Sequence, residues 1–196
     1  MKTSLSLDLT EKEIIRNKTA KPMLYFAIGS MVMLFAGMTS AYVVRLGQGN
    51  WLKFDMPQIF YFSTAVILIC SVTINWAVQS AKKDELAKVR NALLLTLLLG
   101  ITFIVFQFIG WNHLTAQKIF FAGKDSNASG SFFYVITGMH LAHLIGGILY
   151  LLAVTVKSFN KKYNSKNYLS LQLCATYWHF LDGLWIYLFF FLLLIS

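Results

Sequence analysis

Two stretches of this sequence combine titratable side chains with aromatic and small residues at helical spacing. His140 and His143 stand three residues apart in SFFYVITGMHLAHLIGGILY, and His179 and Asp182 stand three apart in YWHFLDGLWIYLFFF. Residues three apart share one face of a helix, so each pair can meet a common partner. Histidine pairs suggest a metal or haem site, and a histidine can pair with a buried carboxylate. These four residues are therefore the first candidates for chemistry.

Both stretches lie in segments that are apolar enough to cross a membrane. The 196 residues are 57% hydrophobic and 13% charged, with a mean hydropathy of +0.61, whereas soluble domains carry about a quarter charged residues. Five apolar segments, near 23–44, 57–79, 90–111, 131–156 and 169–195, are long enough to span a bilayer core of roughly 30 Å. The sequence therefore predicts an all-α polytopic membrane protein, with a polar cytoplasmic N-terminal tail (1–21) and one five-helix transmembrane domain (22–196).

The basic residues predict how the helices are oriented. Thirteen of the 17 Lys and Arg residues fall in the N-terminal tail, in the 80–90 loop and in the 157–170 loop. With five spans these three segments share one side, and the positive-inside rule places that side in the cytoplasm. We expect a cytoplasmic N-terminus and a periplasmic C-terminus. The same rule accounts for the net charge of +9 without a nucleic-acid partner.

Other kinds of site receive little support from the sequence. Cys70 and Cys174 both fall in predicted spans and lack C-x-x-C spacing, so we expect free buried thiols that pack as small hydrophobes. Asp182 is the one acid inside a span, which argues against a transporter or pump that works alone. The sequence has no Gly-rich phosphate loop and no Ser/His/Asp arrangement.

The fourth span has two faces suited to contact with protein. Small residues four apart form a stripe along one side that lets another helix approach closely: Gly138, Ala142 and Gly146. His140, His143 and Gly147 lie on a different side. We expect the stripe to pack within the bundle or against another subunit.

The fifth span carries a polar and aromatic seam on one side: Trp178, His179, Asp182 and Trp185. An unpaired charge near the middle of the membrane costs about 2.5–3.5 kcal/mol on insertion scales. At 1.5 Å per residue, His140 and Asp182 both lie roughly 13–14 Å below the outer boundary, and His143 and His179 roughly 18 Å. We therefore predict a buried cluster of these four residues between the fourth and fifth spans.

A haem or metal site is the alternative that these histidines raise. His140 and His143 are less than one helical turn apart, too close to serve two haems, and His113 falls at an outer helix end. A structural cluster whose members satisfy one another is the preferred interpretation. The stand-alone b-type haem cytochrome stays open as an alternative, and we expect no catalytic, cofactor-binding or metal-binding residue in this chain.

The two stretches quoted at the start, one on the fourth span and one on the fifth, resemble two sequence motifs of subunit III of the haem-copper terminal oxidases. The first motif is matched by Thr137, Gly138, His140, His143 and Gly147, and the second by Tyr177, Trp178, His179, Phe180, Asp182 and Trp185. Upstream, Trp76 fits a tryptophan of the second span, and Gln107 fits the glutamine of a glutamine-plus-acid pattern in the third. The resemblance covers roughly residues 22–196.

The chain departs from the family pattern at informative places. It resembles the short five-helix form, which lacks the first two of seven helices. Met31 stands where many members have a glutamate, Gly110 where an acid is expected, and Leu141 where a glycine separates the histidines. Proton-handling roles of those acids cannot be carried over to this chain.

The resemblance implies an accessory subunit without a redox centre. Haems and copper are expected in partner subunits I and II of a proton-pumping cytochrome c oxidase in a bacterial inner membrane. Subunit I is the main expected contact, and this chain is expected to stabilise it and support proton uptake. A quinol oxidase is the alternative, since subunit II selects the electron donor. Binding of membrane phospholipid and membership of a larger respiratory supercomplex stay open.

Overall fold

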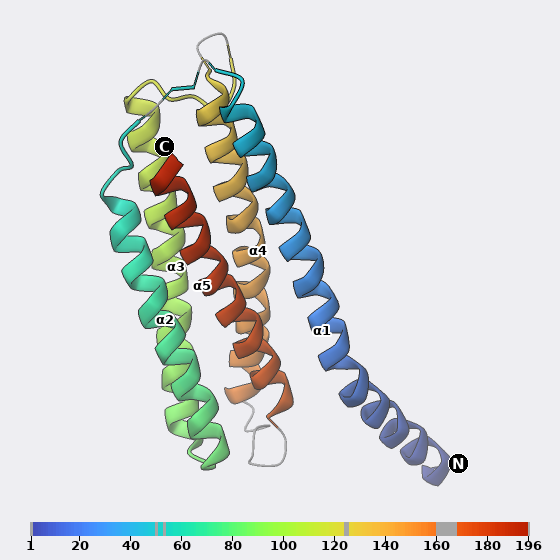
Figure 1. Ribbon diagram of the computed structural model, residues 1–196. Coiled ribbons are helices and arrows are strands. Elements are labelled where there is room, and N and C mark those ends of the chain that lie inside the picture. Colours follow the sequence, from blue (N-terminus) through green and yellow to red (C-terminus); the bar gives the residue numbers. More distant parts are fainter. Residues whose placement is uncertain (1, 50, 53, 124–125, 160–167, 196) are drawn as a thin grey trace.

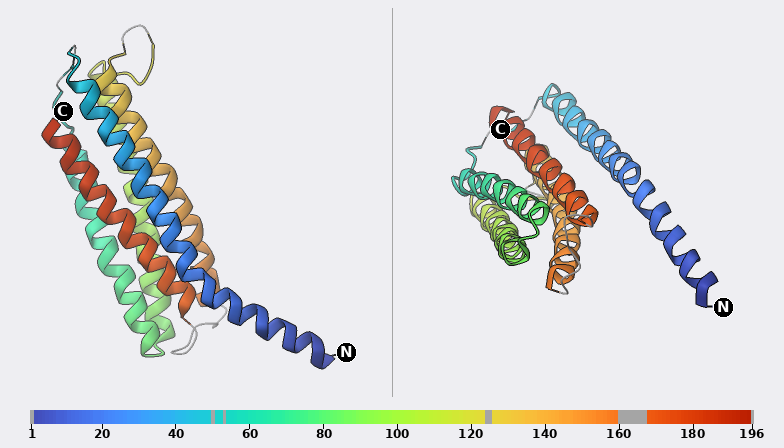
Figure 2. Two further views of the ribbon diagram at one scale, coloured as in Figure 1. Left: turned by 45° about the vertical axis from the view of Figure 1, so that its right-hand side comes forward. Right: turned by 90° about the horizontal axis from the view of Figure 1, so that it is seen from below.

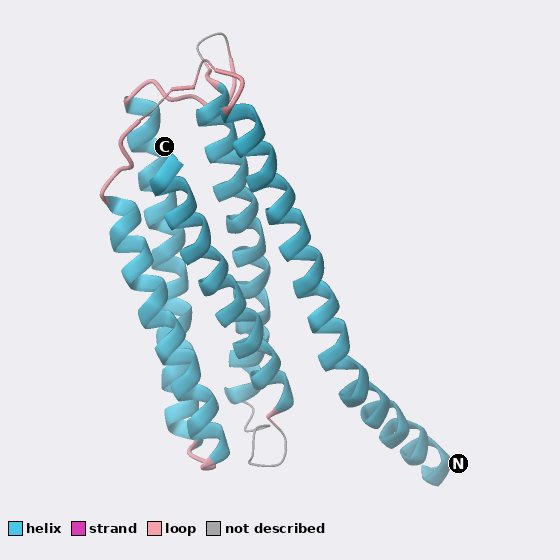
Figure 3. Ribbon diagram, in the orientation of Figure 1, coloured by secondary structure: helices cyan, strands magenta, loops and turns pink. Residues whose placement is uncertain are grey.

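The computed structural model describes residues 2–49, 51, 52, 54–123, 126–159 and 168–195, with side chains from residue 18 onward. These residues form five helices joined by loops and turns, and the described part contains no strand (Figure 3). The helices are α1 (Lys2–Leu46), α2 (Ile59–Lys82), α3 (Leu86–Ala116), α4 (Ala128–Phe159) and α5 (Leu169–Ile195). All five are long and apolar enough to cross a membrane. The prediction of an all-α protein with five spanning helices is confirmed.

Helices α2 to α5 form the bundle, and α1 lies along its side (Figure 1). Each of the four contacts its two neighbours, in the cyclic order α2, α3, α4, α5, and α2 and α3 share the most extensive contact. Helix α1 touches only α4 and α5 among the described helices. Its first turns lead away from the bundle at the end opposite the C-terminus (Figure 2).

Two tight turns end α2 and α3 and set the antiparallel packing. Asp84 takes a left-handed conformation with φ of 58°, and the Glu85 amide donates to the Ser80 carbonyl at 3.0 Å. Lys118 does the same after α3, with φ of 61°. This is the Schellman arrangement, which satisfies the last carbonyls of a helix. The turn at Asp84 lets α3 fold directly back along α2.

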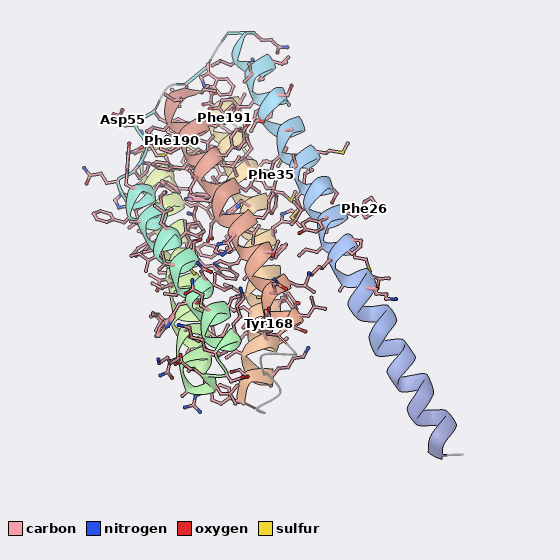
Figure 4. The ribbon with its side chains drawn as sticks, turned by 60° about the horizontal axis from the view of Figure 1, so that its bottom comes forward. Phe26, Phe35, Asp55, Tyr168, Phe190 and Phe191 are labelled. Carbon is pink, nitrogen blue, oxygen red and sulfur yellow. The ribbon has the colours of Figure 1, made fainter. Side chains whose placement is uncertain are left out.

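Aromatic side chains fill the interior of the four-helix bundle. The largest fully buried ones include Trp178 and Trp185 from α5, Phe60 from α2 and Phe103 from α3. On the outer side, Phe35 joins α1 to the bundle while Phe26 lies on the face of α1 away from it, 82% exposed (Figure 4). The bundle is therefore a packed core, with α1 held to it along one strip.

Three helices, α1, α3 and α4, are clearly longer than the predicted spans, whereas α5 has the predicted bounds. Helix α4 begins at Ala128, three residues before the predicted start at Ser131, and α3 extends past both predicted ends. The segment 1–21, expected as a polar tail, is helical from Lys2 and continues through Pro22 into α1. Of the basic residues used to predict orientation, Lys53, Lys124 and those in 160–167 lie outside the described residues.

The expected free thiols are found. Cys70 and Cys174 are both buried and unpaired with one another. The Cys70 thiol donates a weak hydrogen bond to the Thr96 carbonyl at 3.4 Å, so it packs between α2 and α3 as a small hydrophobe does.

Candidate functional site

The polar and aromatic seam of α5 faces α2. Three of its members hydrogen-bond to side chains that α2 places opposite them. Trp178 Nε1 donates to Cys70 Sγ at 3.2 Å, and Trp185 Nε1 donates to Thr64 Oγ1 at 3.0 Å. Between them, His179 Nδ1 and Ser71 Oγ share a hydrogen bond of 2.7 Å. The seam predicted on α5 exists, and it joins α5 to α2.

The predicted single cluster of two histidine pairs is not formed as a hydrogen-bonded unit. His179 is bonded to α2, His143 bonds within its own helix, and His140 and Asp182 make no side-chain hydrogen bonds. Helix α5 contacts both α2 and α4, and the prediction considered only α4 because it is the neighbour in sequence. The partner of His179 therefore comes from 108 residues earlier in the chain.

His140 lies in the aromatic interior of the bundle. Its ring centroid is 5.1 Å from that of Trp185 and 6.1 Å from that of Phe103, and the side chain is 0% exposed. Neither ring nitrogen has a hydrogen-bond partner. Trp185 is three residues beyond Asp182 in α5, or about 4.5 Å along the helix. The predicted match in depth between His140 and Asp182 stays a prediction.

His143 turns outward, towards α1. Its Nδ1 donates to the Met139 carbonyl at 2.8 Å, and its ring lies 5.8 Å from that of Phe35. Its own carbonyl accepts a 3.0 Å hydrogen bond from Tyr177. The two histidines of α4 thus serve different contacts, one in the core and one at the junction with α1.

Asp182 is buried among the side chains of α2 and α5 and is 3% exposed. It lies beside Ser71 and Cys70, and neither carboxyl oxygen has a partner at regular hydrogen-bond geometry. Gln107 is similar: its Nε2 donates a long 3.4 Å bond to Ser63, and its Oε1 has no partner. The core thus holds polar atoms from three helices that are not satisfied by this chain's own groups, which is uncommon in a finished interior.

The remaining first-motif residues hold α4 against its neighbours. Thr137 accepts a 3.2 Å hydrogen bond from Trp111 Nε1 of α3. Gly147 is buried, and a Cβ atom added there would lie 3.1 Å from the Tyr177 ring and 3.3–3.4 Å from Leu181 and Trp178. The glycine lets α4 and α5 approach closely, as small residues do in membrane helices.

The small-residue stripe is not used in this way within the described chain. Gly138 has only the Trp111 ring, at 3.9 Å, near its would-be Cβ, and Gly146 has nothing within 4 Å. Ala142 is exposed. Trp76 is also 43% exposed. Packing of the stripe against another subunit stays a prediction.

The motif residues contribute to helix packing. Among the described residues no three His, Cys, Asp or Glu side chains are grouped so that they could hold a metal ion. The motif residues instead link α5 to α2, α4 to α3, and α4 to α5. These links fix how α2, α3, α4 and α5 pack against one another at the level of the two motifs.

The residues that sequence reasoning missed lie mainly on α2. Thr64 and Ser71 are seven residues apart, as are Ser63 and Cys70, and a seven-residue repeat keeps side chains on one face of a packed helix. That spacing, in a span otherwise rich in Ile, Val and Phe, was the signal that could have identified α2 as the partner of the α5 seam.

Comparison with known proteins agrees with the two motifs. The family model for cytochrome c oxidase subunit III matches residues 23–196. The probable cytochrome c oxidase subunit 3 of Nocardia farcinica is 31% identical over 172 residues, covering 83% of this chain and 81% of that protein. Cytochrome c oxidase subunit 3 of Corynebacterium diphtheriae is 30% identical over 166 residues, covering 81% and 79%. That of Drosophila yakuba is 31% identical over 138 residues, and this chain spans half of its length.

Proposed function

This chain belongs to the cytochrome c oxidase subunit III family, and from that premise we propose that it is an accessory subunit of a proton-pumping respiratory oxidase. In this role it carries no redox centre. It packs against the haem-carrying subunit I, keeps that subunit in its active form and supports proton uptake. The reduction of O2 to water takes place in the partner subunits, which hold the haems and copper.

The observation that carries the proposal is the use of the family's motif residues. Trp178, His179 and Trp185 each bond to α2, and Thr137 bonds to α3. Each of these side chains joins two helices, and this supports a structural role. The motifs that define the family here are contacts that hold the bundle together.

The setting follows from the five apolar helices and the distribution of basic residues. We place the chain in a bacterial inner membrane, with its N-terminus in the cytoplasm and its C-terminus in the periplasm, because the basic segments favour the cytoplasmic side. Subunits I and II and the membrane lipids are its proposed surroundings.

Asp182 provides a direct test of an accessory role. Asp182→Asn keeps the shape of the side chain and removes its ability to ionise. We expect an oxidase containing this variant to start turnover at close to the wild-type rate, because the reaction takes place in other subunits. Since Asp182 is buried beside α2, we expect weaker assembly or a shorter active lifetime. The measurement is O2 consumption over successive turnovers by the purified complex, together with its subunit composition.

Asp55→Asn is the matched control, since Asp55 is an exposed carboxylate in the loop before α2 and its loss should change neither quantity. A complex from which this chain has been removed gives the lower limit of active lifetime. If the Asp182→Asn complex were fully assembled and yet unable to turn over from the start, the accessory role would be wrong and Asp182 would belong to the chemistry.

A further inference from the structure

Hydrogen-bonding side chains gather on the outer side of α2 and α5, where Gln172 and Thr176 also line a pocket with Lys21, Leu24 and Tyr25 of α1. On α2 they recur every four residues, and on α5 at spacings of four and three, so each set follows one helix face. This polar strip consists of Ser71, Asn75 and Gln79 on α2 and Gln172, Thr176 and His179 on α5. Asn75, Gln79 and His179 are exposed, and the other three are half-buried. The Ser71–His179 hydrogen bond of 2.7 Å joins the two rows.

The opposite side of the bundle, formed by α3 and α4, has a different composition. Every exposed residue within 94–109 and 135–156 is apolar. Leu98 is 61% exposed and Leu149 is 62% exposed. Within these ranges the half-buried Thr102 and His143 bond to carbonyls of their own helices. Such a surface is suited to lipid acyl chains without further contacts.

The polar strip lies within the depth of the membrane. His179 is ten residues from the start of α5, or about 15 Å along the helix, and Asn75 is seven residues from the end of α2, or about 10 Å. Polar side chains at such depth almost always face protein or water, since lipid offers them no hydrogen bonds. Lipid acyl chains therefore cannot satisfy the polar strip, although they suit the apolar side formed by α3 and α4.

We propose that the polar strip is the surface by which this chain docks onto a transmembrane helix of the haem-carrying subunit, and that the apolar side faces lipid. The docking helix presents hydrogen-bonding groups along the half of the bundle that contains the α2–α3 turn. This inference rests on the proposed function and adds the face and the residues that make the contact. It also assigns the exposed stripe of Gly138, Ala142 and Gly146 to lipid, in place of the packing against another subunit that the sequence predicts.

Site-specific photo-crosslinking within the assembled complex tests the assignment. A benzophenone amino acid is placed at Val72, beside the polar strip and 70% exposed, or at Leu149 on the apolar side and 62% exposed. Both positions are exposed, so neither insertion disturbs the core. After illumination we expect the Val72 probe to join this chain to the haem-carrying subunit, identified by mass spectrometry, and the Leu149 probe to give no such product.

Asn75→Leu supplies a second readout, with Val72→Leu as its control. We expect Asn75→Leu to cause loss of the haem-carrying subunit from the tagged chain at a detergent concentration that the control complex survives. Crosslinking from Leu149 and not Val72, or from neither while the complex copurifies, would overturn the assigned surface. Failure of the unmodified chain to retain any haem-carrying subunit is a separate result, and it would remove the proposed function itself.

Discussion

Trp178→Ala is expected to destabilise the folded chain by about 3–5 kcal/mol, the usual cost of truncating a large buried aromatic side chain. The Trp178 side chain is 0% exposed. It donates to Cys70 on α2 and lies against the positions of Gly100 on α3 and Gly147 on α4, so its removal opens a cavity where all four helices of the bundle meet. The measurement is detergent-driven unfolding of the purified chain, followed by circular dichroism.

Trp76→Ala is the control for this substitution, since it removes the same side chain from a position that is 43% exposed. We expect its unfolding midpoint to stay close to that of the unmodified chain. If the two variants were equally stable, Trp178 would not be the side chain on which the packing of the four helices depends.

Gly147→Leu is expected to push α4 and α5 apart and to destabilise the bundle by about 1–3 kcal/mol, the usual range for overpacking. The first added carbon alone would meet the Tyr177 ring at 3.1 Å and Leu181 at 3.3 Å. Those neighbours are partly or fully buried, so a larger side chain cannot be accommodated without moving a helix. We expect an earlier midpoint in the same unfolding experiment.

Its neighbour provides the control, because Gly146 has nothing within 4 Å of a would-be Cβ atom. Gly146→Leu should leave the unfolding midpoint of the isolated chain unchanged. The two variants introduce the same side chain at adjacent positions and differ only in the space around it. An unchanged midpoint for Gly147→Leu would show that α4 and α5 do not pack as closely as described.

The helices and their approximate bounds could be predicted from the sequence because spanning segments need long apolar runs, and loops concentrate charge. The polar seam on α5 could be predicted for a similar reason. Trp178, His179, Asp182 and Trp185 recur at helical spacing, so a shared face follows from the geometry of one helix. Both predictions depend only on residues close together in the chain.

What the seam contacts could not be predicted in the same way. His179 bonds to Ser71 and Trp185 to Thr64, and these partners lie on a helix that comes three helices earlier in the chain. Helix order around a bundle is set by packing of whole faces, which no local pattern reveals. The neighbours of His140 were also missed, since its ring lies against those of Trp185 and Phe103.

The sequence also could not predict which buried polar atoms lack a hydrogen-bond partner. His140 and Asp182 looked suited to one another, since a histidine and a carboxylate at similar depth form a natural pair. Instead the rings of Trp185 and Phe103 surround His140, and Asp182 turns to α2. Which aromatic rings lie against His140 depends on three-dimensional packing rather than on spacing in the sequence.

The measurement that tests the central claim most directly is purification of a tagged form of this chain from its own membrane in mild detergent, with an absorbance spectrum of the product. An accessory oxidase subunit is expected to elute with haem-containing partner subunits and to show no haem absorbance once those partners are stripped away in harsher detergent. Elution of the folded chain without any haem-containing partner, or a stoichiometric Soret band that stays with the chain alone, would contradict the account.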